Sequence, residues 1–116
     1  MRDQSVGHKK KIVENNIKNA VNIILKQDLG NIKFKDISVT NVTLNKDKSV
    51  AKIYWDTYLV EENLVFEKLL SKMGSKVRTM LSQKLKLRYT PRLDFIYDSQ
   101  FIEEEKITKI LDEQKS

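Results

Sequence analysis

Apolar residues recur along the chain with two different periods. Residues 9–29 carry one every three or four positions, which predicts an amphipathic helix that ends near Gly30. The stripe expected to face the core consists of Val13, Ile17, Ala20, Val21, Ile24 and Leu25. The same spacing returns over residues 62–85, from Phe66 to Leu85, and predicts a second helical stretch.

Residues 36–45 are rich in β-branched side chains and predict a strand, but their alternation changes phase half-way. The apolar residues fall into two pairs on opposite faces, Ile37 with Val39 and Val42 with Leu44. One extra residue in a strand shifts its alternation by one position. We therefore predict a β-bulge near Thr40–Asn41, which brings both pairs onto one face.

The turn NKDK at 45–48 leads into a second strand at 49–58. In that strand Ala51, Ile53 and Trp55 share one face. We expect the two strands to form a hairpin with these side chains in the core. Trp55 is accordingly interpreted as a core residue and not as a surface aromatic.

Gly74 interrupts the helical stretch at 62–85. Glycine in a helix interior costs roughly 1 kcal/mol relative to alanine. The nearby serines, Ser71 and Ser75, are of a type that caps helix ends. We therefore predict two helices that meet at a kink and not one long helix.

The only proline, Pro91, divides the stretch LKLRYTPRLDFIYD. Proline biases the residue before it away from helical geometry, so residues 87–92 are expected to form a loop. The alternation that follows predicts a strand at 92–97. The side chains expected to face the core are Leu93, Phe95 and Tyr97.

The predicted order is helix, strand, strand, helix, kink, helix, strand, with a short C-terminal helix at about 101–113. We predict an α+β fold in which a three-stranded sheet is covered on one face by helices. Because this is the type II KH order, residues 1–116 are interpreted as a single KH-like domain with its core at about 9–98. KH domains normally hold single-stranded nucleic acid with a GXXG loop, which this chain lacks.

The composition narrows the possible chemistry. The chain contains no cysteine and a single histidine, His8, which excludes disulfides, thiolate nucleophiles and a two-histidine metal site. No spacing suggests a nucleophile with its base, so we expect no enzyme activity, no metal and no cofactor. No apolar run approaches the ~18 residues of a membrane span.

The net charge of +6 is concentrated in one segment. Residues 76–92 hold six basic and no acidic side chains, whereas residues 93–116 hold three basic against seven acidic ones. Such a basic face is typical of proteins that contact phosphates, although a solvated helix face gives the same pattern. The candidate RNA contacts are Lys9, Lys10, Lys11, Lys18, Lys76, Arg78, Lys84, Lys86, Arg88 and Arg92. They lie on different helix faces, so we do not expect all of them to bind. Tyr89, inside the basic loop, is the candidate for stacking on a base.

The chain resembles the ribosome-binding factor A family in three stretches and in its opening helix, and the resemblance as a whole covers roughly residues 8–112. LRYTPRLDFIYDSQFIEEEKITKIL is similar to its C-terminal signature, a basic-flanked proline followed by a strand ending in Tyr-Asp and an acidic helix. SVAKIYWDTY resembles its second strand, and MGSKVRTMLSQKLKLR resembles its third helix, with its arginine at Arg78. Met73, Gly74 and Ser75 stand where that family replaces the GXXG loop with a kink.

The resemblance implies a non-catalytic factor that binds the small ribosomal subunit and its rRNA during late maturation and rRNA processing. It also implies a cytoplasmic protein with no cofactor, no membrane and no small-molecule substrate, which we expect to be a monomer. Arg78 is the contact expected to matter most, with a surface salt bridge as its alternative role. The alternative function is a small α+β interaction module whose basic face binds an acidic protein.

Overall fold

The computed structural model describes residues 2–99, with side chains from residue 9 onward. The predicted helix at 101–113 lies outside the described residues. The elements are α1 (Arg2–Ile23), the π-helical turn η1 (Ile24–Asp28), the 3-10 turn η2 (Ile32–Asp36), β1 (Ser38–Leu44), β2 (Val50–Asp56), the 3-10 turn η3 (Val60–Glu62), α2 (Asn63–Leu85) and β3 (Arg92–Tyr97). No helix in this part of the chain is long and apolar enough to cross a membrane.

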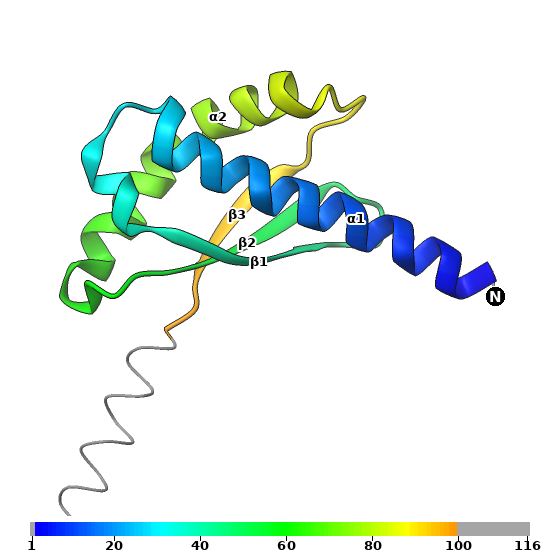
Figure 1. Ribbon diagram of the computed structural model, residues 1–116, viewed down its shortest axis with the longest axis horizontal. Coiled ribbons are helices and arrows are strands. Elements are labelled where there is room, and N and C mark those ends of the chain that lie inside the picture. Colours follow the sequence, from blue (N-terminus) through cyan, green and yellow to red (C-terminus); the bar gives the residue numbers. More distant parts are fainter. Residues whose placement is uncertain (1, 100–116) are drawn as a thin grey trace, which may run out of the picture.

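The three strands form one sheet in the order β1-β2-β3 (Figure 1). β1 and β2 are antiparallel and form the predicted hairpin, whereas β3 runs parallel to β2. Parallel neighbours require a long crossover, and α2 supplies it between β2 and β3. The fold is therefore α+β with a three-stranded sheet, as predicted, and it contains two long helices.

The predicted β-bulge is confirmed in β1. Val39 pairs with Trp55 and Asn41 pairs with Tyr54, so Thr40 is the extra residue. The Thr40 hydroxyl donates a hydrogen bond to the Tyr54 carbonyl at 3.3 Å, which fixes the irregular position. All four apolar side chains on the two sides of the bulge are buried, because the extra residue restores their common face.

The helices cover one face of the sheet, and the core lies between them and the strands, as the sequence predicts. The core consists of Ile17, Ala20, Val21, Ile24, Leu25, Phe34, Ile37, Val39, Val42, Leu44, Ala51, Ile53, Trp55, Phe66, Leu70, Val77 and Leu81, with Leu93, Phe95 and Tyr97 packed against it. Trp55 is fully buried, and its ring centroid lies 4.7 Å from that of Tyr97. On the opposite sheet face Lys52 and Asp94 are exposed.

Polar side chains of α1 bind the free edge of β1. Glu14 Oε2 accepts a hydrogen bond from the Leu44 amide at 2.7 Å, and Asn22 binds the backbone of Val39. A free strand edge otherwise offers unpaired amides and carbonyls to other chains. Because these two side chains bind at Val39 and Leu44, the protein itself covers part of this edge. Figure 1 shows α1 crossing the strands, with its N-terminal turns projecting past the sheet.

The predicted division of the second helical stretch is wrong. α2 runs without a break across Met73, Gly74 and Ser75. On the two sides of the glycine, Leu70 and Val77 are fully buried. Burial of each such side chain contributes about 1.5–3 kcal/mol, which exceeds the roughly 1 kcal/mol that glycine costs in a helix. The helix therefore continues through Gly74.

Candidate nucleic-acid interface

The residues after α2 form a loop that is fixed at both ends. Lys86 ends the helix in a left-handed conformation with φ 51°. At the other end the side chain of Arg78 donates from Nη2 to the Thr90 carbonyl at 2.7 Å and from Nε to the Pro91 carbonyl at 3.1 Å. Pro91 is itself buried. Residues 86–91, called the 86–91 loop below, therefore have a defined path between α2 and β3.

The tip of the 86–91 loop presents an aromatic ring with a cation beside it. Tyr89 is 79% exposed, the largest exposed fraction among the large hydrophobic side chains of the described residues. The guanidinium carbon of Arg88 lies over its ring, 5.6 Å from the centroid. This distance falls within the range of a cation–π interaction. The pair is thus held together at the surface while most of the tyrosine stays in contact with water.

One side of the 86–91 loop borders a polar groove of about 610 Å³. Its wall on α2 carries the hydroxyl and amide side chains of Ser75, Thr79, Ser82 and Gln83. Arg88 and Tyr89 form the wall on the loop. This "polar groove" offers hydrogen-bond donors and acceptors next to positive charge.

The other side of the loop borders a second groove, of about 600 Å³, which we call the apolar groove. Three elements that are distant in sequence meet here, namely α1, the β1–β2 turn and the 86–91 loop. The apolar lining comes from Val13, Ile17, Leu44, Leu87 and Pro91. Lys48, Arg78, Arg88 and Tyr89 add charge and an aromatic ring to the same lining. A ligand that is flat and apolar in one part and anionic in another matches this combination.

Lys48 is a site residue that the sequence analysis missed. It occupies the β1–β2 turn with φ 62°, in the left-handed region. Next to it, Asp47 accepts hydrogen bonds from the Ser49 hydroxyl at 2.6 Å and the Ser49 amide at 3.1 Å. These bonds lower the pKa of the Asp47 carboxyl below its usual value. The turn motif was visible in the sequence, but only the tertiary fold brings it beside the 86–91 loop.

The structure brings together three of the predicted site residues, Arg78, Arg88 and Tyr89. It gives Arg78 a role that was not anticipated, because its guanidinium binds two carbonyl groups of the loop and, among the residues that the structure describes, no acidic partner. A guanidinium has five N–H donors. Within the described part of the chain two of them bind the loop, which leaves three for water or a ligand.

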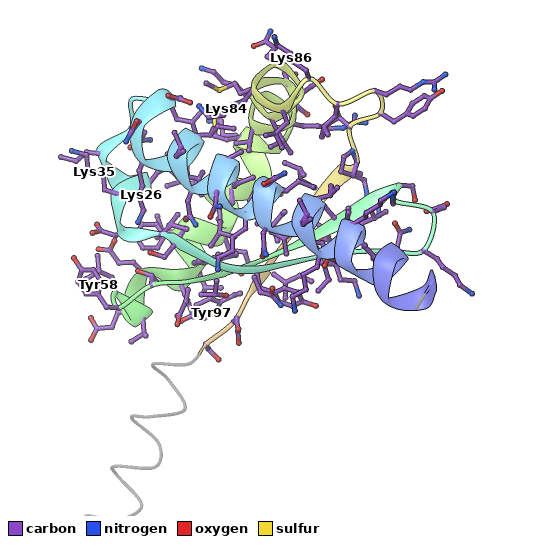
Figure 2. The ribbon with its side chains drawn as sticks, turned by 45° about the vertical axis from the view of Figure 1, so that its right-hand side comes forward. Lys26, Lys35, Tyr58, Lys84, Lys86 and Tyr97 are labelled. Atoms are coloured by element: carbon purple, nitrogen blue, oxygen red, sulfur yellow. The ribbon has the colours of Figure 1, made fainter. Side chains whose placement is uncertain are left out.

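Three other predicted contacts, on α2 and just after it, line neither groove. Lys76 is exposed, and Lys84 lies 3.4 Å from Asp28 in an ion pair at the surface. Exposed pairs of this kind contribute about 0.2–1 kcal/mol, so the pair holds Lys84 only weakly. Figure 2 places Lys84 and Lys86 toward the C-terminal end of α2, and Lys26 on the η1 segment.

The remaining predicted contacts lie on other surfaces. Arg92 lies at the start of β3, where it borders a hollow of about 330 Å³ together with Lys52 and Asp94. Four predicted contacts lie on α1. Lys9 and Lys11 are exposed, whereas Lys10 and Lys18 are partly buried. Among the described residues, no group of three or more His, Cys, Asp and Glu side chains is placed to hold a metal ion.

A family model described as "Ribosome-binding factor A" matches residues 9–111. The chain belongs to the ribosome-binding factor A family. A ribosome-binding factor A of Ruthia magnifica is 35% identical over 83 residues, which cover 72% of this chain and 73% of that relative. One of Francisella tularensis subsp. novicida is 30% identical over 87 residues, 75% of this chain and 61% of that longer protein. The chain therefore spans less than two thirds of the Francisella relative.

Solved structures of the ribosome-binding factor A family share the fold. The crystal structure of the Thermus thermophilus protein matches with a TM-score of 0.65 and 27% identity, over 76% of this chain and 94% of that one. A homology model of the Thermus thermophilus factor, fitted into the cryo-EM map of a 30S complex with that factor, matches with a TM-score of 0.62 and 26% identity. That match covers 76% of this chain and 93% of the fitted one.

Proposed function

We propose that this chain is a non-catalytic ribosome assembly factor. It binds the small ribosomal subunit through its rRNA during late maturation and rRNA processing, as a monomer in the cytoplasm. Membership of the ribosome-binding factor A family supports the role, and the 30S complex of the Thermus thermophilus factor supports the choice of partner.

The observation that carries the proposal is the 86–91 loop. It presents Arg88 and Tyr89 on a fixed backbone, with Arg78 and Lys48 beside them. Phosphate contacts dominate the affinity of proteins for nucleic acid and carry little sequence information. A cluster of cations on a fixed loop is suited to such contacts, because little side-chain and backbone freedom is lost on binding.

Binding to rRNA should depend steeply on salt. With about four phosphate contacts to single-stranded RNA, the affinity is expected to fall about 50-fold between about 50 and about 200 mM salt. The test is sedimentation of the protein with immature small subunits through gradients that contain increasing salt. The charge reversal Arg88→Glu is expected to release the protein at lower salt than wild type.

The matched control is Lys33→Glu, which makes the same charge change on the exposed surface of η2. Figure 1 shows this segment at the end of the fold opposite the 86–91 loop. Equal release by both variants would mean that net charge, and not the 86–91 loop, determines binding. Co-purification with an acidic protein that survives nuclease treatment would instead support the interaction module and contradict the proposed function.

A further inference from the structure

Tyr89 combines two properties that the fold does not require of it. Its ring packs into no core, since it is 79% exposed, yet its backbone lies in a loop fixed by Arg78. An exposed aromatic on a fixed backbone loses little freedom when a flat group packs on it. The ring is therefore available for stacking on a ligand.

The surroundings of the ring indicate what that flat group is. The apolar groove beside it has a volume within the range of small-ligand sites, and Leu87 and Pro91 line it with apolar surface. Lys48 and Arg88 line the same groove with positive charge. The one acid in the lining, Asp47, already accepts two hydrogen bonds from Ser49. The charge of the groove thus suits an anionic ligand with a flat apolar part.

We propose that the apolar groove binds one unpaired nucleotide of an RNA chain, with its base stacked on Tyr89 and its phosphate near Lys48 and Arg88. The proposal rests on the proposed function and specifies which part of the RNA this site takes. Arg88 occupies one face of the tyrosine ring, at 5.6 Å from the centroid. The base takes the other face, so that guanidinium, tyrosine and base form a continuous stack.

A paired nucleotide cannot occupy this site. Both faces of a base in a helix are covered by neighbouring bases, and recognition by stacking therefore selects loops, bulges and single strands. Stacking is tolerant of sequence because every base has a π-face. The apolar groove is accordingly expected to distinguish unpaired from paired RNA without reading a particular base.

The test measures binding of the full chain to a mixed-sequence RNA single strand that carries 2-aminopurine, and to the same strand in a duplex. Wild type is expected to bind the single strand more tightly and to quench 2-aminopurine fluorescence. Tyr89→Ala should weaken binding to the single strand about 5- to 150-fold and abolish the quenching, while Tyr89→Phe keeps both. Because the ring is exposed, neither variant should change the folded state.

Tyr58→Ala is the matched control, since Tyr58 is also exposed but lies beyond β2, away from the apolar groove. It should leave affinity and quenching unchanged. The proposal is wrong if Tyr89→Ala binds the single strand as wild type does, if wild type prefers the duplex, or if polyglutamate binds as tightly as the single strand. In each of those cases salt-sensitive sedimentation with small subunits still supports the proposed function, whereas loss of that sedimentation in wild type overturns the function itself.

Discussion

Asn22 of α1 and Val39 of β1 exchange two hydrogen bonds. The Val39 amide donates to Asn22 Oδ1 at 2.8 Å, and Asn22 Nδ2 donates to the Val39 carbonyl at 3.1 Å. A side-chain amide thus replaces the backbone of a neighbouring strand at the edge of the sheet. The replacement lies next to the β-bulge at Thr40, where the ladder between β1 and β2 is irregular.

Asn22→Ala is expected to destabilise the fold by about 1–3 kcal/mol, because both backbone groups of Val39 lose their partner in a partly buried place. The measurement is urea unfolding followed by circular dichroism. Asn19→Ala makes the same change at an exposed position of α1 and should cost less than about 0.5 kcal/mol. Equal costs would show that the edge contact does not contribute.

Arg78→Ala is expected to loosen the 86–91 loop. The variant loses the hydrogen bonds to the Thr90 and Pro91 carbonyls. A buried hydrogen bond from a charged donor contributes about 1.5–3 kcal/mol to stability. The contribution is smaller here because Arg78 is exposed to solvent. Hydrogen exchange should show faster exchange of the Arg92 amide at the end of the loop, which donates to the Ser49 carbonyl at 2.9 Å in wild type. Lys76→Ala, an exposed change on the same helix, should leave exchange in the loop as it is in wild type.

Gly74→Ala is expected to stabilise the protein by about 0.5–1 kcal/mol. A Cβ atom at this position meets nothing within 4 Å apart from its chain neighbours and the adjacent helix backbone, and the helix is continuous there. The control is Gly30→Ala, which should destabilise, because Gly30 has φ +70° and a side chain strains that conformation. The measurement is the melting temperature of each variant relative to wild type. A loss of stability in Gly74→Ala would contradict an unbroken α2.

Asp47, in the β1–β2 turn, should make the stability of the protein depend on pH in the acidic range. The Ser49 hydroxyl, and then the Ser49 amide, lower the pKa of the Asp47 carboxyl in the folded state. A group whose pKa is depressed by folding stabilises the protein above its unfolded pKa, about 3.9 for aspartate, and this contribution is lost as the pH falls through the folded value.

Wild type should therefore lose more stability than Asp47→Asn as the pH is lowered below about 4. Urea unfolding of both proteins at a series of pH values measures the difference. Parallel curves for the two proteins would show that the hydrogen bonds from Ser49 do not favour the charged carboxylate.

The strands were predictable because one face of the sheet is buried, and apolar and polar residues therefore alternate along each strand. The alternation changes phase between Val39 and Val42, and one extra residue in the strand restores a common face for both. The bulge at Thr40 is that extra residue. The alternation after Pro91 likewise predicted β3 at Arg92–Tyr97. In each case a local period encodes which side chains are buried.

Features decided by packing at a distance were not predictable in the same way. The cost of Gly74 is a local quantity, whereas the burial of Leu70 and Val77 that outweighs it depends on the whole core. Charge along the chain indicated a basic segment, but Arg78 binds the backbone of the loop and Arg92 borders a different hollow with Lys52 and Asp94. Lys48 reaches the apolar groove only because the β1–β2 turn and the 86–91 loop meet in space.

The parallel pairing of β3 with β2 has a consequence for the order of events during synthesis. The hairpin of β1 and β2 joins neighbouring residues and can form early, whereas residue 50 pairs with residue 92 only after all of α2 has been made. The carbonyl groups that Arg78 holds lie directly before β3. The path of the Arg88–Tyr89 tip is therefore complete in the nascent chain only when β3 docks, so the RNA recognition that we propose for this tip has to wait until the sheet is complete.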